Sequence, residues 1–244
     1  MPEIQFENIK EQSYAAKESL RAIKTNIQFL GDDIQTILFT SSIPDEGKST
    51  VVINLARSIA DSGKKILVID ADIRKSVLIG RLKARDIQGE QIYGLSHYLS
   101  GQKTMEEVLN KTNIPRVHII FSGPSVINPT EILEKNYFAQ MIQKARKIYD
   151  YILIDCPPLG AAIDAAVIAK NCDGAIIVVG QDMVGGRMVS GVKRQLEATG
   201  IRVLGGILNK VKTRKGGYYG SYYGSYYGNY YRNDSDSQGK QGRK

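Results

Sequence analysis

Six short apolar runs, separated by longer segments with helical periodicity, constrain the fold of this chain most strongly. The runs are rich in Ile and Val and do not alternate with polar residues, which is typical of strands buried on both faces of a parallel sheet. They lie at residues 36–40, 65–70, 117–121, 151–155, 175–179 and 202–209. Helices between such strands predict a doubly wound, mostly parallel α/β fold, in which ligands bind beyond the carboxyl ends of the strands.

Two further segments flank this pattern. Over residues 13–30, apolar side chains recur at steps of three and four from Ala16 to Leu30, and Gly31 follows, which predicts an amphipathic helix. After about residue 212 the composition changes to Gly, Ser, Tyr, Asn, Lys and Arg, which is typical of disorder. We therefore predict a folded domain over residues 1–211 and a disordered tail over residues 212–244.

The net charge of +8 is concentrated in the tail, since eight Lys/Arg and two Asp from Lys210 onward supply +6 of it. The body is therefore nearly neutral. No apolar run approaches the roughly 18 to 20 residues that span a bilayer, and the N-terminus lacks the pattern of a secretory signal. Cys156 and Cys172 form neither a disulfide framework nor a metal-ligand pattern. These features favour a reducing cytoplasm.

The stretch "TSSIPDEGKST" at residues 40–50 follows the first apolar run and opens a helical segment. A loop that ends in Gly-Lys-Ser at such a junction presents backbone N–H groups and a helix N-terminus to phosphate. Lys48 can reach the terminal phosphates, and the Ser49 hydroxyl can ligate magnesium. Ser42 stands where this motif usually has its first glycine. The stretch predicts a site for nucleotide phosphates.

Two other apolar runs end in carboxylates. "ILVIDADIR" contains Asp70 and Asp72, and "YILIDCPP" contains Asp155. Carboxylates in this position can hold magnesium and its waters, or accept a proton from an attacking hydroxyl. A lone aspartate at a strand end is more often a helix cap, but three beside a phosphate loop favour a catalytic centre.

The tail contains a cluster of tyrosines in four pairs, separated mostly by Gly and Ser. Its members are Tyr218, Tyr219, Tyr222, Tyr223, Tyr226, Tyr227, Tyr230 and Tyr231. No aliphatic residue lies within the cluster, so the rings cannot belong to a conventional core.

Together these motifs resemble those of the bacterial tyrosine kinases of capsular and exopolysaccharide synthesis, in the form whose cytoplasmic kinase is separate from its membrane activator. "SSIPDEGKST" resembles the Walker A motif of that family, "ILVIDADIR" its Walker A-prime motif, and "ILIDCPP" its Walker B motif. The tyrosine cluster resembles the family's C-terminal one. The resemblance implies a P-loop NTPase fold of the MinD/ParA-like type, with ATP and Mg²⁺ as cofactors.

The resemblance also implies roles for individual residues. Lys48 binds the phosphates, and Asp70 accepts the proton of the incoming tyrosine hydroxyl. Ser49, Asp72 and Asp155 hold magnesium, directly or through water. The residues implied to bind the nucleotide are Asp45, Glu46, Gly47, Lys48, Ser49, Thr50 and, at the adenine, Asn209.

The segment "ESLRAIKTNIQF" resembles the family's oligomerisation motif, which maps onto Glu18, Arg21 and Lys24. The third position is usually Arg, and Lys cannot reproduce a bidentate contact, so we expect a weaker contact there. The resemblance implies a ring-shaped homo-oligomer, a membrane-embedded activator that brings the chain to the membrane, and a cognate tyrosine phosphatase.

On this interpretation the tail tyrosines, Tyr218 to Tyr231, are the substrate. Sequence alone allows the tail to reach its own site or a neighbouring subunit's, and the resemblance favours the neighbour. Eight phosphotyrosines add roughly −12 to −16 of charge. The tail then changes from +6 to strongly negative, which we expect to expel it and dissolve the ring.

Three other interpretations remain. A MinD/ParA-like positioning ATPase has the same fold, but its phosphate loop carries an extra lysine where this chain has Ile43, and Gly-Gly where it has Pro44-Asp45. The pattern argues against a nucleic-acid-binding module, because the basic residues flank the tyrosines and do not alternate with them. The third is an ATPase with an adhesive tail that is not a substrate.

Overall fold

The computed structural model describes residues 1–9 and 11–212. Met1–Lys210 form one compact unit, and Val211–Lys244 are a separate unit. The predicted disorder of the tail and all eight tyrosines of its cluster therefore lie outside the described residues. The predicted boundary at residue 211 stays a prediction.

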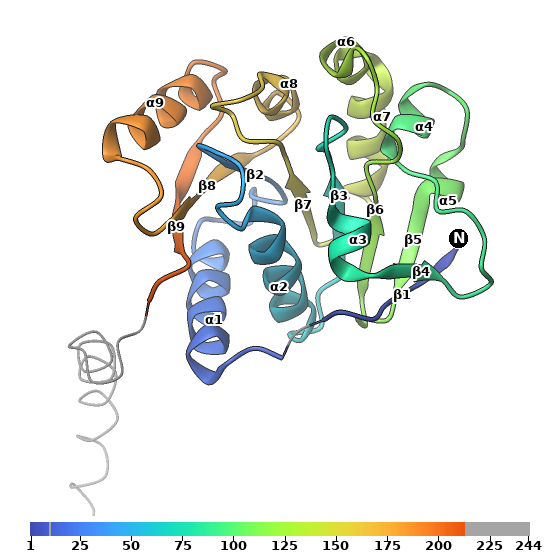
Figure 1. Cartoon of the computed structure of the whole chain (residues 1–244), viewed down its shortest axis with the longest axis horizontal. Helices are drawn as coiled ribbons and strands as arrows, with labels where there is room; N and C mark the ends of the chain where they lie inside the picture. Colours follow the sequence, from blue (N-terminus) through green and yellow to red (C-terminus); the bar gives the residue numbers. More distant parts are fainter. Residues whose placement is uncertain (10, 213–244) are drawn as a thin grey trace, which may run out of the picture. The chain divides into compact units, whose positions relative to one another are not determined.

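The described strands form one sheet in the order β4-β1-β5-β6-β3-β7-β2-β8-β9 (Figure 1). Neighbouring strands from β6 to β9 are all parallel, whereas β5 is antiparallel to β6 and β4 is antiparallel to β1. The strands are β1 Glu3–Phe6, β2 Thr36–Ser41, β3 Ile66–Asp70, β4 Ala84–Asp86, β5 Leu109–Thr112, β6 Val117–Ile120, β7 Tyr151–Asp155, β8 Gly174–Gly180 and β9 Val203–Asn209. The mostly parallel α/β fold is confirmed.

The six predicted apolar runs correspond to β2, β3, β6, β7, β8 and β9. The sequence pattern missed β1, β4 and β5, which have only three or four residues each. Their residues alternate between buried and exposed, or are largely polar, because these strands lie toward the edge of the sheet. So short an alternation is too weak to distinguish a strand from a loop.

Helices cover both faces of the sheet (Figure 1). They are α1 Tyr14–Gln28, α2 Lys48–Ala60, α3 Leu78–Leu82, α4 Leu95–Leu99, α5 Met105–Val108, α6 Pro129–Glu134, α7 Asn136–Ala145, α8 Asp164–Ala169 and α9 Gly186–Glu197. Along β2, Ile37 and Phe39 pack into the core beneath α1 and α2, whereas Leu38 packs into the core beneath α7 and α8. Because successive side chains of a strand point to opposite faces, one strand contributes to both cores, as the doubly wound fold requires.

The predicted N-terminal helix is present as α1. The Ser13 side chain caps it by accepting a hydrogen bond from the Ala16 N–H at 3.2 Å. Leu20 and Ile27, seven residues apart, are its buried side chains, and α1 lies against α2. The apolar stripe therefore serves first to dock α1 on the domain.

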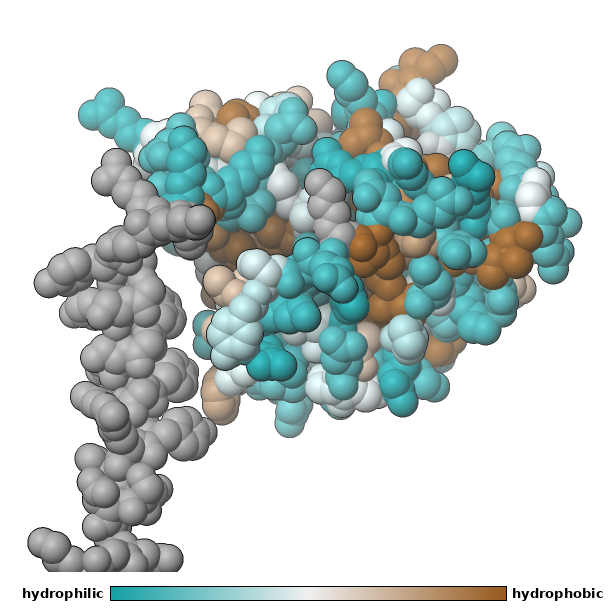
Figure 2. Space-filling model, turned by 60° about the horizontal axis from the view of Figure 1, so that its bottom comes forward, coloured by the Kyte–Doolittle hydropathy of each residue, from teal (hydrophilic) through white to brown (hydrophobic). Residues whose placement is uncertain are grey.

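The face in Figure 2 is mostly hydrophilic, with apolar side chains in patches separated by polar ones. Among the described residues, no helix is both long enough and apolar enough to cross a bilayer. The two cysteines are free, with Cys156 buried and Cys172 partly buried.

Candidate active site

The site begins at the loop between β2 and α2. Gly47 precedes the first residue of α2 with a φ of 90°, a conformation that glycine adopts without strain. A Cβ there would lie 2.1 Å from the Asn209 side-chain nitrogen, so glycine is also required sterically. The backbone N–H groups of the first turn of α2, from Lys48 to Thr50, are free for an anion, as in other phosphate-binding helix N-termini.

Lys48 and Asp155 form the centre of the site. Lys48 Nζ lies 3.8 Å from Asp155 Oδ1, and their side chains are only 11% and 4% exposed. Burial raises the pKa of Asp155, while the Lys48 ammonium and a hydrogen bond from the Ser49 side chain oppose that rise. Asp155 Oδ1 is buried and accepts no hydrogen bond. A buried carboxylate oxygen without a donor is costly, and a cation would satisfy it.

Asp70 lies directly beside Asp155, because β3 and β7 are parallel neighbours whose register pairs these two residues. Burial first, and the charge of Asp155 second, raise the pKa of Asp70 to about 7. Hydrogen bonds from the Ser76 hydroxyl and the Asp72 N–H oppose this rise. A carboxyl group that titrates near neutral pH is suited to take a proton from a substrate hydroxyl.

Asp72 completes the carboxylate group. Its charge raises the pKa of both Asp70 and Asp155, and its N–H donates to Asp70 Oδ1 at 3.3 Å. Its Oδ1 accepts a hydrogen bond from the Lys75 N–H at 3.0 Å. The described residues contain no group of three or more His, Cys, Asp or Glu that could hold a metal ion on their own. The donors present, which are two carboxylates and a serine hydroxyl, fit a hard cation such as Mg²⁺ whose remaining ligands are phosphate oxygens and water.

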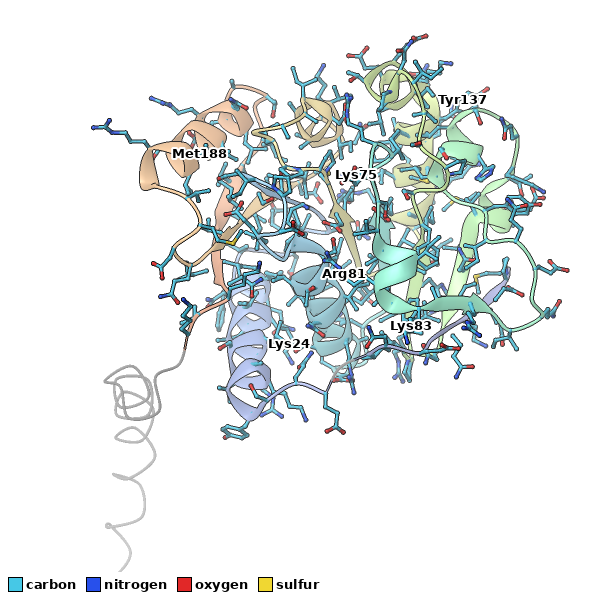
Figure 3. The ribbon with its side chains drawn as sticks, viewed as in Figure 1. Lys24, Lys75, Arg81, Lys83, Tyr137 and Met188 are labelled. Atoms are coloured by element: carbon cyan, nitrogen blue, oxygen red, sulfur yellow. The ribbon has the colours of Figure 1, made fainter. Side chains whose placement is uncertain are left out.

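Three predicted nucleotide-binding residues have distinct surroundings. Asp45 has a φ of 63° and an exposed side chain, whose Oδ1 lies 3.9 Å from Arg81 Nη2. Arg81 extends from α3 toward this loop (Figure 3). The Glu46 side chain points into the protein and is buried. Asn209 donates a side-chain N–H to the Glu46 carbonyl at 2.9 Å, and its predicted adenine contact stays a prediction.

The sequence pattern did not reveal an ion pair between the buried Asp164 and the partly exposed Arg74 beside the site. Asp164, at the start of α8, is fully buried and binds the Arg74 guanidinium through both of its oxygens. Thr130 on α6 donates its hydroxyl to Asp164 at 2.8 Å. The pair fixes the loop after β3 against α6 and α8. Asp164 occurs within the apolar stretch "AAIDAAVIA", and a single charge in such a stretch is a signal of a buried, paired residue.

The predicted oligomerisation residues lie on α1, apart from the site. Glu18 and Arg21 form an ion pair at 2.5 Å, with their side chains largely exposed. Within the described ranges, no ion pair involves Lys24, which Figure 3 shows on the same helix. These three residues are thus available on the helix surface, and their role in assembly stays a prediction.

Comparison with known proteins agrees with this geometry. Residues 34–199 match a family model described as an AAA domain. The chain is 43% identical over 200 residues to the tyrosine-protein kinase CpsD of Streptococcus agalactiae, covering 82% of this chain and 84% of that one. The kinase domain of the Escherichia coli tyrosine kinase Etk superposes with a TM-score of 0.73 at 28% identity, covering 82% and 78% of the two chains.

A more distant match is the septum site-determining protein MinD of Pyrococcus horikoshii complexed with Mg-ADP. It has a TM-score of 0.60 at 25% identity and covers 75% of this chain and 72% of that one. The fold is therefore that of P-loop nucleotide-binding proteins, and the higher sequence identity lies with kinases. The chain belongs to the bacterial tyrosine-protein kinases of the CpsD type. As such it is an enzyme that phosphorylates tyrosine with a nucleoside triphosphate.

Proposed function

We propose that this kinase transfers the γ-phosphate of ATP to the tyrosines of its own C-terminal cluster, between the subunits of a homo-oligomer. The observation that carries the proposal is the pairing of Asp70, whose pKa is raised to about 7, with Asp155 and Lys48 at the phosphate loop. A free tyrosine hydroxyl has a pKa near 10 and needs a base before it can attack phosphorus.

The chain's own residues divide the work. The first turn of α2 and Lys48 bind and orient the phosphates, and Lys48 also neutralises charge as the terminal phosphoryl group leaves. Asp70 accepts the proton of the tyrosine hydroxyl, and Ser76 holds the Asp70 carboxylate in place. Burial keeps water away from this proton transfer.

Mg²⁺ would be held by Ser49, Asp72 and Asp155, and the Oδ1 atom of Asp155, which accepts no hydrogen bond, supports that assignment. When bound, the ion supplies charge neutralisation for the phosphates. It also lowers the carboxylate pKa values, because a divalent cation favours their ionised forms.

The wider assignments rest on the resemblance to kinases of capsular and exopolysaccharide synthesis. We propose that the chain is cytoplasmic and regulates the synthesis and export of such a polysaccharide. A membrane-embedded activator would complete its active site and bring it to the membrane, and a tyrosine phosphatase would reset the tail. Glu18, Arg21 and Lys24 would contribute to a ring of subunits.

A mixing experiment tests both transfer and its direction. One variant carries Lys48→Met with an intact tail, and the other carries an intact site with all eight tail tyrosines replaced by Phe. Each alone is expected to remain unmodified in the tail after incubation with Mg-ATP. Mixed together, with the activator's cytoplasmic segment present, they are expected to yield phosphate on Tyr218 to Tyr231 of the Lys48→Met chain. A modified wild-type chain with an unmodified mixture would show transfer within one chain, and no modification in either would contradict the kinase proposal.

The positioning-ATPase alternative is supported by the likeness to MinD. It predicts ATP hydrolysis without phosphotyrosine. Ile43 stands where such ATPases carry their additional lysine, so the charge they use at that position is missing here. The kinase proposal therefore accounts for more of the site.

A further inference from the structure

Glu46 lies in the phosphate loop and is only 1% exposed, although the side chain of its neighbour Asp45 is open to solvent. Its carboxylate accepts hydrogen bonds from three backbone N–H groups. Oε2 accepts from Ser42 at 2.7 Å and from Ile43 at 2.9 Å, and Oε1 accepts from Gly180 at 3.0 Å. One side chain thus fixes both the start of the loop and the end of β8.

The main chain of Glu46 extends this connection to β9. The Glu46 carbonyl accepts from the Asn209 side chain at 2.9 Å, and the Asn209 carbonyl accepts from the Gln181 N–H at 2.9 Å. Gln181 follows Gly180 directly, so the hydrogen bonds close a ring from Glu46 through the ends of β8 and β9 and back. The phosphate loop is therefore held from both its side chain and its main chain.

The way in which the Glu46 carboxylate is stabilised indicates its role in the loop. Within the part of the chain that the structure describes, no ion pair involves its carboxylate, so backbone N–H groups alone stabilise it. A buried carboxylate beside a phosphate site opposes phosphate binding through charge repulsion. Its presence there therefore calls for another role, such as shaping the loop. Charge-assisted hydrogen bonds to backbone N–H groups are strong, and three of them can hold a loop in one conformation.

We propose that Glu46 is a positioning residue, whose side chain sets the conformation of the phosphate loop and makes no contact with the nucleotide. Both of its oxygens act only as acceptors. The amide oxygen of Gln can still accept the two bonds from Ser42 and Ile43. Its NH₂ group would then face the Gly180 N–H, and two donors cannot form a hydrogen bond, so the bond to Gly180 would be lost. This inference rests on the nucleotide-binding part of the proposed function and is independent of whether tyrosine is the acceptor.

The test is calorimetric titration of the full chain with Mg-ADP. Glu46→Ala removes all three bonds and is expected to weaken Mg-ADP binding at least tenfold. Glu46→Gln is expected to fall between Glu46→Ala and the wild type. In the same proteins, amide hydrogen exchange at Gly180 is expected to be faster than in the wild type, because its N–H loses its acceptor.

Asn110→Ala is the matched control. Asn110 is fully buried on β5, and its side chain donates to the carbonyls of Val108 and Ile119. Its loss is expected to lower the unfolding temperature while leaving Mg-ADP affinity unchanged in the folded protein. Folded Glu46→Ala that binds Mg-ADP within twofold of the wild type would overturn the proposal.

If Glu46→Ala does not fold, Glu46→Gln decides alone. Weaker Mg-ADP binding together with faster exchange at Gly180 supports the proposal, and no change in either measurement overturns it. A chain that binds Mg-ADP normally but never phosphorylates tyrosine would refute the proposed function and leave this inference intact.

Discussion

The centre of the sheet and its flank differ in burial, strand length and strand direction. The central strands β3, β7 and β2 are buried on both faces, and their carboxyl ends carry the phosphate loop and two carboxylates. The flank of β4, β1 and β5 is short, partly antiparallel and alternately exposed. Burial at the centre therefore raises the pKa of the carboxyl groups that the chemistry uses, whereas the flank mainly extends the sheet and adds stability.

The largest expected effect comes from removing the charge at the phosphate loop. Lys48→Met should reduce tail phosphorylation by roughly 10³-fold or more, because the phosphates lose a buried ammonium group. Lys111→Met is the control on the flank, where Lys111 forms an exposed ion pair with Glu3. Quantitative mass spectrometry of both variants should show loss only in the first. Equal activity of the two variants would abolish the distinction between centre and flank.

The second-largest effect is expected from Asp70→Asn. Loss of the base should lower the rate of transfer by roughly 10²- to 10⁴-fold. Asn can still accept a hydrogen bond from Ser76, so Mg-ADP affinity should stay within about threefold of the wild type. Calorimetry that shows a large loss of affinity would instead make Asp70 primarily a metal ligand.

The raised pKa of Asp70 also predicts how stability depends on pH in magnesium-free buffer. The folded carboxyl keeps its proton up to about pH 7, whereas the unfolded one loses it near pH 4. Folding therefore takes up a proton between these values. The wild type should lose about 1.4 kcal/mol of unfolding free energy per pH unit relative to Asp70→Asn, or about 4 kcal/mol in total.

Urea denaturation of both proteins at about pH 4.5, 6 and 8 measures this difference. The difference should level off above about pH 7, where the folded carboxyl is also ionised. Saturating Mg-ADP should reduce it, because a bound cation favours the ionised carboxylate. A difference that does not change with pH would contradict the assigned pKa.

The smallest expected effect lies on the flank. Ile4 on β1 is 1% exposed, and Ile4→Val should cost about 0.5 to 1.5 kcal/mol of unfolding free energy by removing one buried methyl group. Mg-ADP affinity should not change, since β1 is separated from β3 by β5 and β6. A loss of affinity as large as that of a site variant would mean that the flank is coupled to the centre.

The sequence predicted the centre far better than the flank. Asp70 and Asp155 were recognisable because each ends a continuous apolar run, and parallel strands bring such ends together at one edge. The alternation in β1 and β5 covers only four residues and carries little signal. Glu46 was assigned to the nucleotide because it lies within the motif. Its inward direction depends on β8 and β9, which are more than a hundred residues away along the chain.

The most direct test of the account is the ratio of phosphotyrosine formed to ADP released. It would be measured on the wild-type chain with Mg-ATP, the activator's cytoplasmic segment and no phosphatase. We expect a ratio near one until the tail is filled, because the buried site keeps water away while Asp70 accepts the proton of a tyrosine hydroxyl. Sustained ADP release with an unmodified tail would contradict it and identify the buried carboxylates as the centre of an ATPase.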